Sequence, residues 1–102
     1  MNDNQKIAEW AGLDHSYYAA HLDEIPKYTE SDQEAISLLP VLVERQFPFR
    51  LYYTSASNRY VFEINHGWQN QKGYTMFTEK YAPTFSGAVT SAVLSLIDKE
   101  QV

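Results

Sequence analysis

The stretch from residue 47 to residue 81 places the tightest constraint on the fold. It contains three runs in which apolar and polar side chains alternate, separated by two polar connections. Alternation with a period of two places successive side chains on opposite faces of a β-strand. The runs cover residues 49–54, 60–65 and 74–79. Because the connections between them are short, the simplest topology is a three-stranded antiparallel meander.

Aromatic residues occur on both faces of this predicted sheet. Tyr53 shares a face with Phe49, whereas Tyr52 faces the other way. We therefore expect helices to cover both faces at least in part. The second connection, residues 66–73, is polar except for Trp68 and is predicted to form a loop.

Three helical patterns flank the strands, over residues 4–13, 29–46 and 86–100. Each has apolar residues at the i, i+3, i+4 spacing of an amphipathic helix. Pro40 lies inside the second pattern and has no N–H to donate, so we predict a single helix that is kinked there. Residues 14–28 show no sustained period and are predicted to be a long connection.

Local signals mark the helix ends. Asp3 is the predicted N-cap of the first helix, and Gly12 its predicted stop. Ser31 opens a capping-box pattern with a glutamate three residues later. Thr84 or Ser86 is expected to cap the last helix. The predicted fold class is α+β, an α/β/α sandwich in the order α-α-β-β-β-α, forming a single domain over residues 1–102.

Composition disfavours several kinds of chemistry. The chain has no cysteine, which removes disulfides, thiol nucleophiles and cysteine-based zinc sites. It has four glycines and no nucleophile-elbow, phosphate-loop or Ser-x-x-Lys motif. The atoms needed to bind a metal are present in His15, His21, Asp23 and Glu24, but their spacing matches no metal motif. We therefore predict a protein that is not an enzyme and that uses no cofactor or metal. No signal peptide or membrane span is visible, which predicts a soluble protein in the host cytoplasm.

The charge is distributed unevenly along the chain. Residues 1–46 carry nine acidic and three basic residues, whereas residues 47–102 carry four acidic and five basic residues. A protein that binds nucleic acid or anionic lipid normally presents a basic face, so neither partner is expected. The field of this chain instead favours a basic protein partner.

Acidic residues cluster between residues 23 and 34, with only Lys27 to offset them. Tyrosine and tryptophan are also more numerous than one small core needs, and both are common at binding surfaces. The predicted partner-binding residues are Tyr17, Tyr18, Asp23, Glu24, Glu30, Asp32 and Trp68. The alternatives are a solvated loop for the acidic residues and, for the tryptophan, a side chain folded back on the sheet. One exposed patch of the tryptophan and tyrosines would also allow a homodimer.

Several short sequence segments carry a family resemblance. IAEWAGL near the start, the pattern from Pro26 to Leu42 and the pattern from Tyr81 to Leu96 resemble the phage alpha-beta-alpha sandwich domain family, which consists of small phage and prophage proteins. The chain departs from this family over residues 14–26 and in the loop of residues 66–72. The resemblance implies a fold and a phage origin, and it implies no catalytic residues.

The functional hypothesis is a non-enzymatic phage or prophage accessory protein that binds a host protein. Its most specific version is an inhibitor of bacterial defence, similar to an anti-CRISPR protein, whose acidic face competes for a nucleic-acid-binding groove. One alternative is a protein that sequesters a nucleotide signal, with Arg50, Arg59 or Lys72 on its phosphates. Another alternative is a structural or assembly role in the phage.

Overall fold

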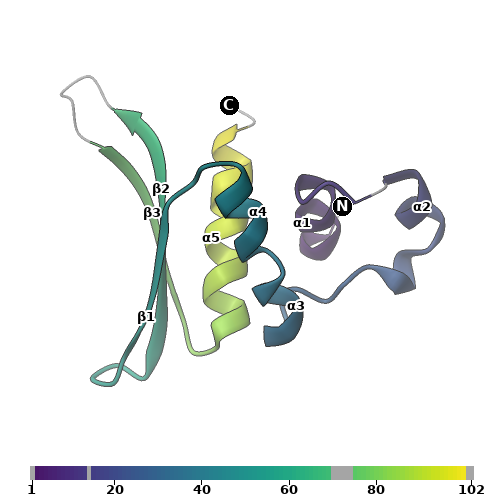
Figure 1. Cartoon of the computed structure of the whole chain (residues 1–102). Helices are drawn as coiled ribbons and strands as arrows, with labels where there is room; N and C mark the ends of the chain where they lie inside the picture. The colour runs from purple at the N-terminus through teal and green to yellow at the C-terminus, as the bar shows by residue number, and fades with distance from the viewer. Residues whose placement is uncertain (1, 14, 70–74, 101–102) are drawn as a thin grey trace.

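The computed structural model describes residues 2–13, 15–69 and 75–100 (Figure 1). Its sheet contains β1 (Phe49–Thr54), β2 (Arg59–Gln69) and β3 (Thr75–Ala82) in the order β1-β2-β3. Both pairings are antiparallel. The predicted α+β class, with two helical segments before a three-stranded antiparallel sheet and one after it, is confirmed.

The second hairpin is longer than the alternation indicated. Residues 66–69, predicted to lie in a loop, belong to β2, and β3 continues to Ala82. Main-chain pairing between the two strands satisfies backbone N–H and C=O groups whatever the side chains are, so it extends past the apolar run. The register shifts between Asn65 and Gln69. Trp68 is therefore a strand residue, and its side chain lies outside the described part of the structure.

Helix α5 (Phe85–Glu100) lies against β2 and β3 and forms the centre of the molecule (Figure 1). Val89, Val93 and Leu96 on this helix are fully buried. The N–H of Gly87 donates to Oγ1 of Thr84 over 3.0 Å, so Thr84 is the cap, one of the two predicted candidates. The helix thus supplies the apolar layer that covers one face of the sheet.

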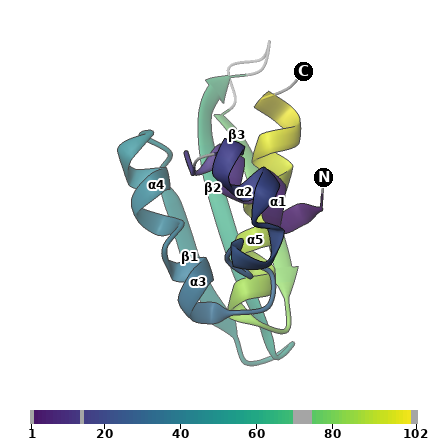
Figure 2. The same ribbon diagram turned by 90° about the vertical axis from the view of Figure 1, so that its right-hand side faces the viewer.

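The remaining helices are α1 (Asp3–Trp10), α2 (His15–Ala20), the 3₁₀ turn η1 (Leu22–Glu24), α3 (Asp32–Ile36) and α4 (Leu39–Glu44). Of these, α3 and α4 lie beside α5, and α1 and α2 lie farther from the sheet (Figures 1 and 2). Figures 1 and 2 show all of them on the same side of the sheet as α5. None of the helices in the described ranges is long and apolar enough to cross a bilayer.

The layer arrangement differs from the expected sandwich, because the helices cover one face of the sheet rather than both (Figures 1 and 2). The cause lies in the strands. Phe62 and Ile64 of β2 belong to the buried core that includes α5. Arg50, Glu63 and Glu79 stand on the other face, where water can solvate their charges. A second helical layer there would bury charged groups.

The predicted kinked helix over residues 29–46 is two helices. Pro40 cannot donate a hydrogen bond to the carbonyl of Ile36, and α3 ends at that residue. Pro40 then occupies the first turn of α4, where its missing N–H is not needed. The break changes the direction of the apolar stripe, so Val43, which directly follows the fully buried Leu42, is 65% exposed.

The first helix begins one residue earlier than predicted. Asn2, not Asp3, is its N-cap, because Asn2 Oδ1 accepts from the N–H of Gln5 and Gln5 Oε1 accepts from the N–H of Asn2, each over 2.8 Å. Gly12 follows the helix in the left-handed region at φ 92°, which confirms the predicted stop. Trp10 is buried, and the guanidinium of Arg45 lies 4.5 Å from its ring centre.

Candidate functional site

No helix in the described ranges covers one face of the sheet, and we call this the open face. Its outward-facing residues on the three strands include Arg50, Tyr52, Arg59, Val61, Glu63, Glu79 and Tyr81. Val61 of β2 has Tyr52 and Tyr81 as its neighbours on either side. It has no exposed surface although it lies outside the main core cluster. The two tyrosines, 36% and 54% exposed, therefore shield an apolar centre on this face.

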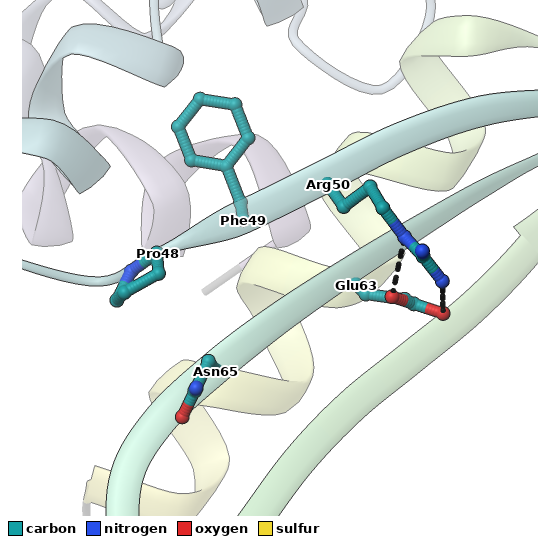
Figure 3. Close-up of a pocket in the computed structure, with 5 residues that line it drawn as sticks. All are labelled: Pro48, Phe49, Arg50, Glu63 and Asn65. Carbon is teal, nitrogen blue, oxygen red and sulfur yellow. Dashed lines mark hydrogen bonds and ion pairs between the residues drawn. The ribbon is translucent and has the colours of Figure 1, made fainter.

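A row of charged residues lies beside these tyrosines. Arg50 donates from Nε to Glu63 Oε2 over 3.0 Å and from Nη2 to Oε1 over 3.1 Å (Figure 3). The same guanidinium lies 5.0 Å from the ring centre of Tyr52. Two parallel hydrogen bonds and a ring contact hold the arginine along the sheet. Its side chain remains 68% exposed.

The same row holds a second carboxylate. Glu79 of β3 is directly opposite Glu63, and its Oε1 accepts a hydrogen bond from the hydroxyl of Tyr81. The hydrogen bonds from Arg50 lower the pKa of Glu63, whereas the hydrogen bond to Glu79 raises the pKa of the Tyr81 phenol. Two carboxylates thus stand side by side in a row that has one cation. Like charges in this position destabilise a sheet unless another cation approaches.

Lowering the pH is expected to remove the stabilisation that Glu63 supplies. Because the pKa of Glu63 is lowered in the folded chain, its contribution is present above the unfolded pKa of about 4.3 and disappears as the pH falls through the folded pKa. Thermal midpoints measured from about pH 7 down to about pH 3 should therefore fall less steeply for Glu63→Gln than for the native chain.

The partner residue supplies the control for this pH prediction. Arg50→Met should flatten the same pH dependence, because it removes the hydrogen bonds that lower the pKa of Glu63. The double variant should be no flatter than either single variant, since both remove one interaction. An unchanged slope in Glu63→Gln would show that the pair contributes nothing to stability.

A hollow of about 360 Å³ adjoins the charged row where β2 continues past the start of β1. Pro48, Phe49, Arg50, Glu63 and Asn65 line it (Figure 3). Figure 3 also shows the ring of Phe49 pointing away from the ion pair. The volume is at the small end for ligand sites. Because the guanidinium already makes a bidentate pair with Glu63, this hollow suits a phosphate less well than the nucleotide hypothesis requires.

A second surface lies on the opposite side of the molecule, at α2 and the segment that follows it (Figure 1). We call it the acidic surface and define it by Tyr17, Leu22, Asp23, Glu24 and Glu30. Leu22 is 56% exposed and Tyr17 is 45% exposed. The Tyr17 hydroxyl donates to Glu24, and its ring stacks on His21 with centres 4.2 Å apart. Asp23 and Glu30 make no side-chain hydrogen bond or ion pair with any described residue.

The irregular part of this segment is anchored to the core. Ile25 and Tyr28 are 8% and 3% exposed and belong to the main core cluster. The N–H of Thr29 donates to Asn4 Oδ1 over 3.1 Å, and the N–H of Ser31 donates to the Lys27 carbonyl over 2.9 Å. These contacts fix the backbone that carries the acidic residues.

The structure brings only some of the predicted site residues together. Tyr17, Asp23 and Glu24 are close in the chain and share the acidic surface. Asp32 instead accepts a hydrogen bond from the N–H of Ser86 over 3.0 Å, so it supports the first turn of α5. Trp68 lies in β2, and the sheet and α2 are on opposite sides of the molecule (Figure 1).

Two further predictions concern side chains near α2. Tyr18 lies in α2, and its side chain is outside the described part of the structure. The possible metal ligands, including His21, do not form a set of three with other histidine, aspartate or glutamate residues in the described ranges.

Sequence reasoning missed the open face. Its signal was present, because Arg50 and Tyr52 share one phase of the alternation in β1 and Val61 and Glu63 share it in β2. Alternation separates the side chains of a strand into two faces, but it does not show which of the two faces the helices cover.

Comparison with known proteins adds no further evidence: no family model, no curated protein and no solved structure matches this chain. The resemblance to the phage family stays a prediction, and the function is argued from the two surfaces.

Proposed function

We propose that this protein is a non-enzymatic accessory protein of a phage or prophage that binds a basic surface of a host protein through its acidic surface. The most specific form of the proposal is an inhibitor of host defence, similar to an anti-CRISPR protein. In that form, carboxylates take the place of nucleic-acid phosphates in a basic groove.

One observation carries the proposal: an acid-rich segment with little regular structure is held in place by two buried side chains, Ile25 and Tyr28. A surface that is already ordered loses less entropy on binding than a mobile loop does. The anchoring therefore supports a role in recognition over the alternative of a solvated loop.

The composition of the acidic surface also supports protein binding. Leu22 and Tyr17 are exposed beside the carboxylates of Asp23 and Glu24. Apolar and aromatic side chains with charged residues around them are typical of interfaces in which few residues supply most of the affinity. The charged residues would speed association with a basic partner and make it sensitive to salt.

The test is a comparison of two charge-reversal variants. Asp23→Lys with Glu30→Lys changes the acidic surface, whereas Glu44→Lys with Asp98→Lys changes exposed acidic residues on α4 and α5 by the same total charge. Each chain is expressed in a bacterium that is immune to a phage through a nucleic-acid-guided defence, and plaques are counted. Each chain is also used to capture proteins from the host lysate, with quantification by mass spectrometry.

We expect the native chain and the Glu44, Asp98 control to restore plaques and to retain the same basic protein. The Asp23, Glu30 variant should lose both activities, by at least about tenfold, if each lost charge pair contributes about 1 kcal/mol. Equal behaviour of the two variants, or no effect of the native chain on plaques or capture, would refute the proposal.

A further inference from the structure

The open face is suited to contact with a second copy of the same chain. The whole chain has a formal charge of −5, so most approaches of two copies are repulsive. The open face differs, because its two arginines, Arg50 and Arg59, balance its two glutamates, Glu63 and Glu79. The open face therefore adds no net charge to a contact between two copies.

The charges on the two outer strands of this face, Arg50 of β1 and Glu79 of β3, are complementary under a two-fold axis. Arg50, Glu63 and Glu79 form one cross-strand row, and Tyr52, Val61 and Tyr81 form the neighbouring row. A two-fold axis along β2 exchanges the positions of β1 and β3 between two stacked sheets, and each row faces itself. Arg50 of one copy then faces Glu79 of the other, and Tyr52 faces Tyr81 of the other. On the axis itself, Arg59, Val61 and Glu63 of β2 each face the same residue of the other copy.

We propose that the open faces of two copies stack to form a homodimer about this axis, with two Arg50–Glu79 ion pairs between the copies. Stacked sheets lie about 10 Å apart, a gap that an arginine and a glutamate from opposite sides can span. The strands of two aligned sheets cross at about 30°. At this angle, the cross-strand rows of the two copies stay opposite each other near the axis.

The ion pair uses groups that the single chain leaves available. Arg50 donates hydrogen bonds to Glu63 from two of its N–H groups. A guanidinium has five N–H groups, so others can donate to a second carboxylate. Glu79 stands beside Glu63 and accepts from a tyrosine hydroxyl, so a cation from the second copy relieves the repulsion within the row. The proposal rests on this face alone and is independent of the acidic surface on the other side of the molecule (Figure 1).

The aromatic row supplies the apolar part of the contact. Tyr52 and Tyr81 are exposed, and Val61 lies between them. Stacking the two faces covers these rings, which bring large area at low entropic cost. Because the sheet has three strands and β1 has six residues, the contact is small, and we expect a dissociation constant on the order of 10 µM.

Sedimentation velocity of the full chain from about 1 to about 200 µM tests the proposal, since this range brackets the expected constant. Glu79→Arg is the decisive variant. Within one chain it places a cation beside Glu63, so its thermal midpoint should not fall. Between two copies it places the introduced guanidinium against Arg50 of the other copy, so the dimer should weaken at least tenfold.

Exchange of the two charges should restore the dimer. The double variant Arg50→Glu with Glu79→Arg keeps one cation and two carboxylates in the row and again places opposite charges across the axis. A native chain that stays monomeric over the whole range would overturn the proposal. So would a dimer that Glu79→Arg leaves intact, or one that the double variant fails to restore.

Discussion

Replacing Phe62 with alanine should lower the free energy of unfolding by about 3–5 kcal/mol. Among the described residues, Phe62 is the largest side chain with no exposed surface, and it lies on β2, the central strand, against the helical side of the sheet. Its ring stacks on that of Phe49 with centres 5.5 Å apart. Truncation therefore removes apolar burial and an aromatic pair together, and it leaves a cavity under α5.

A loss of this size is a large part of the 5–15 kcal/mol that holds a domain together, so the variant should melt at least about 12 °C below the native chain. Urea unfolding and thermal melts at about 0.5 µM, far below the dissociation constant expected for the dimer, measure it. Tyr53→Ala is the matched control: it removes a ring from the neighbouring strand that is 52% exposed, and it should cost less than about 1 kcal/mol. Similar losses in the two variants would contradict the placement of the core.

The three strands could be predicted because alternation is a local property. Phe62 and Ile64 share one phase of the alternation in β2, and both are fully buried on the helical side of the sheet. Coverage of the other face could not be predicted in this way. Aromatic residues occur in both phases, and only the packing of α5 decides which phase is buried. Val61 illustrates the limit, since it is buried on the open face by tyrosines of adjacent strands.

The helical region was harder to predict for a different reason. Pro40 was expected to kink one helix, but the loss of its N–H ends α3 and allows α4 to begin afresh. Across this break, residues at i, i+3 and i+4 no longer lie on the same face of one helix. Leu42 is therefore buried while Val43 is exposed. A periodic pattern reports burial only as long as the helix axis is continuous.

In the irregular segment that carries the acidic surface, the sequence likewise does not show which side chains are buried. The sequence identified the acidic residues at positions 23, 24 and 30, and all are exposed. It could not separate the surplus tyrosines from those of the core: Tyr17 is 45% exposed, whereas Tyr28 is 3% exposed. Without a helix or strand there is no period from which burial can be inferred, so tertiary packing alone separates the two tyrosines.

Replacing Tyr28 with alanine should therefore destabilise the protein by about 3 kcal/mol, because it empties a core position. It should also release the acidic surface. The amide hydrogens of Thr29 and Ser31, which donate to Asn4 and Lys27, should exchange faster than in the native chain under conditions where the sheet stays protected. Chemical unfolding and hydrogen exchange measure the two effects on the same sample.

Tyr17→Ala separates anchoring from binding. Its side chain is 45% exposed, so stability should change by less than about 1 kcal/mol, while capture of the host protein should weaken. Tyr28→Ala should weaken capture as well, but through disorder of the segment, so lowering the temperature should recover part of it. If Tyr28→Ala is as stable as the native chain, the segment is not held by the core. Recognition would then have to rest on a surface that orders only on contact, at a higher entropic cost.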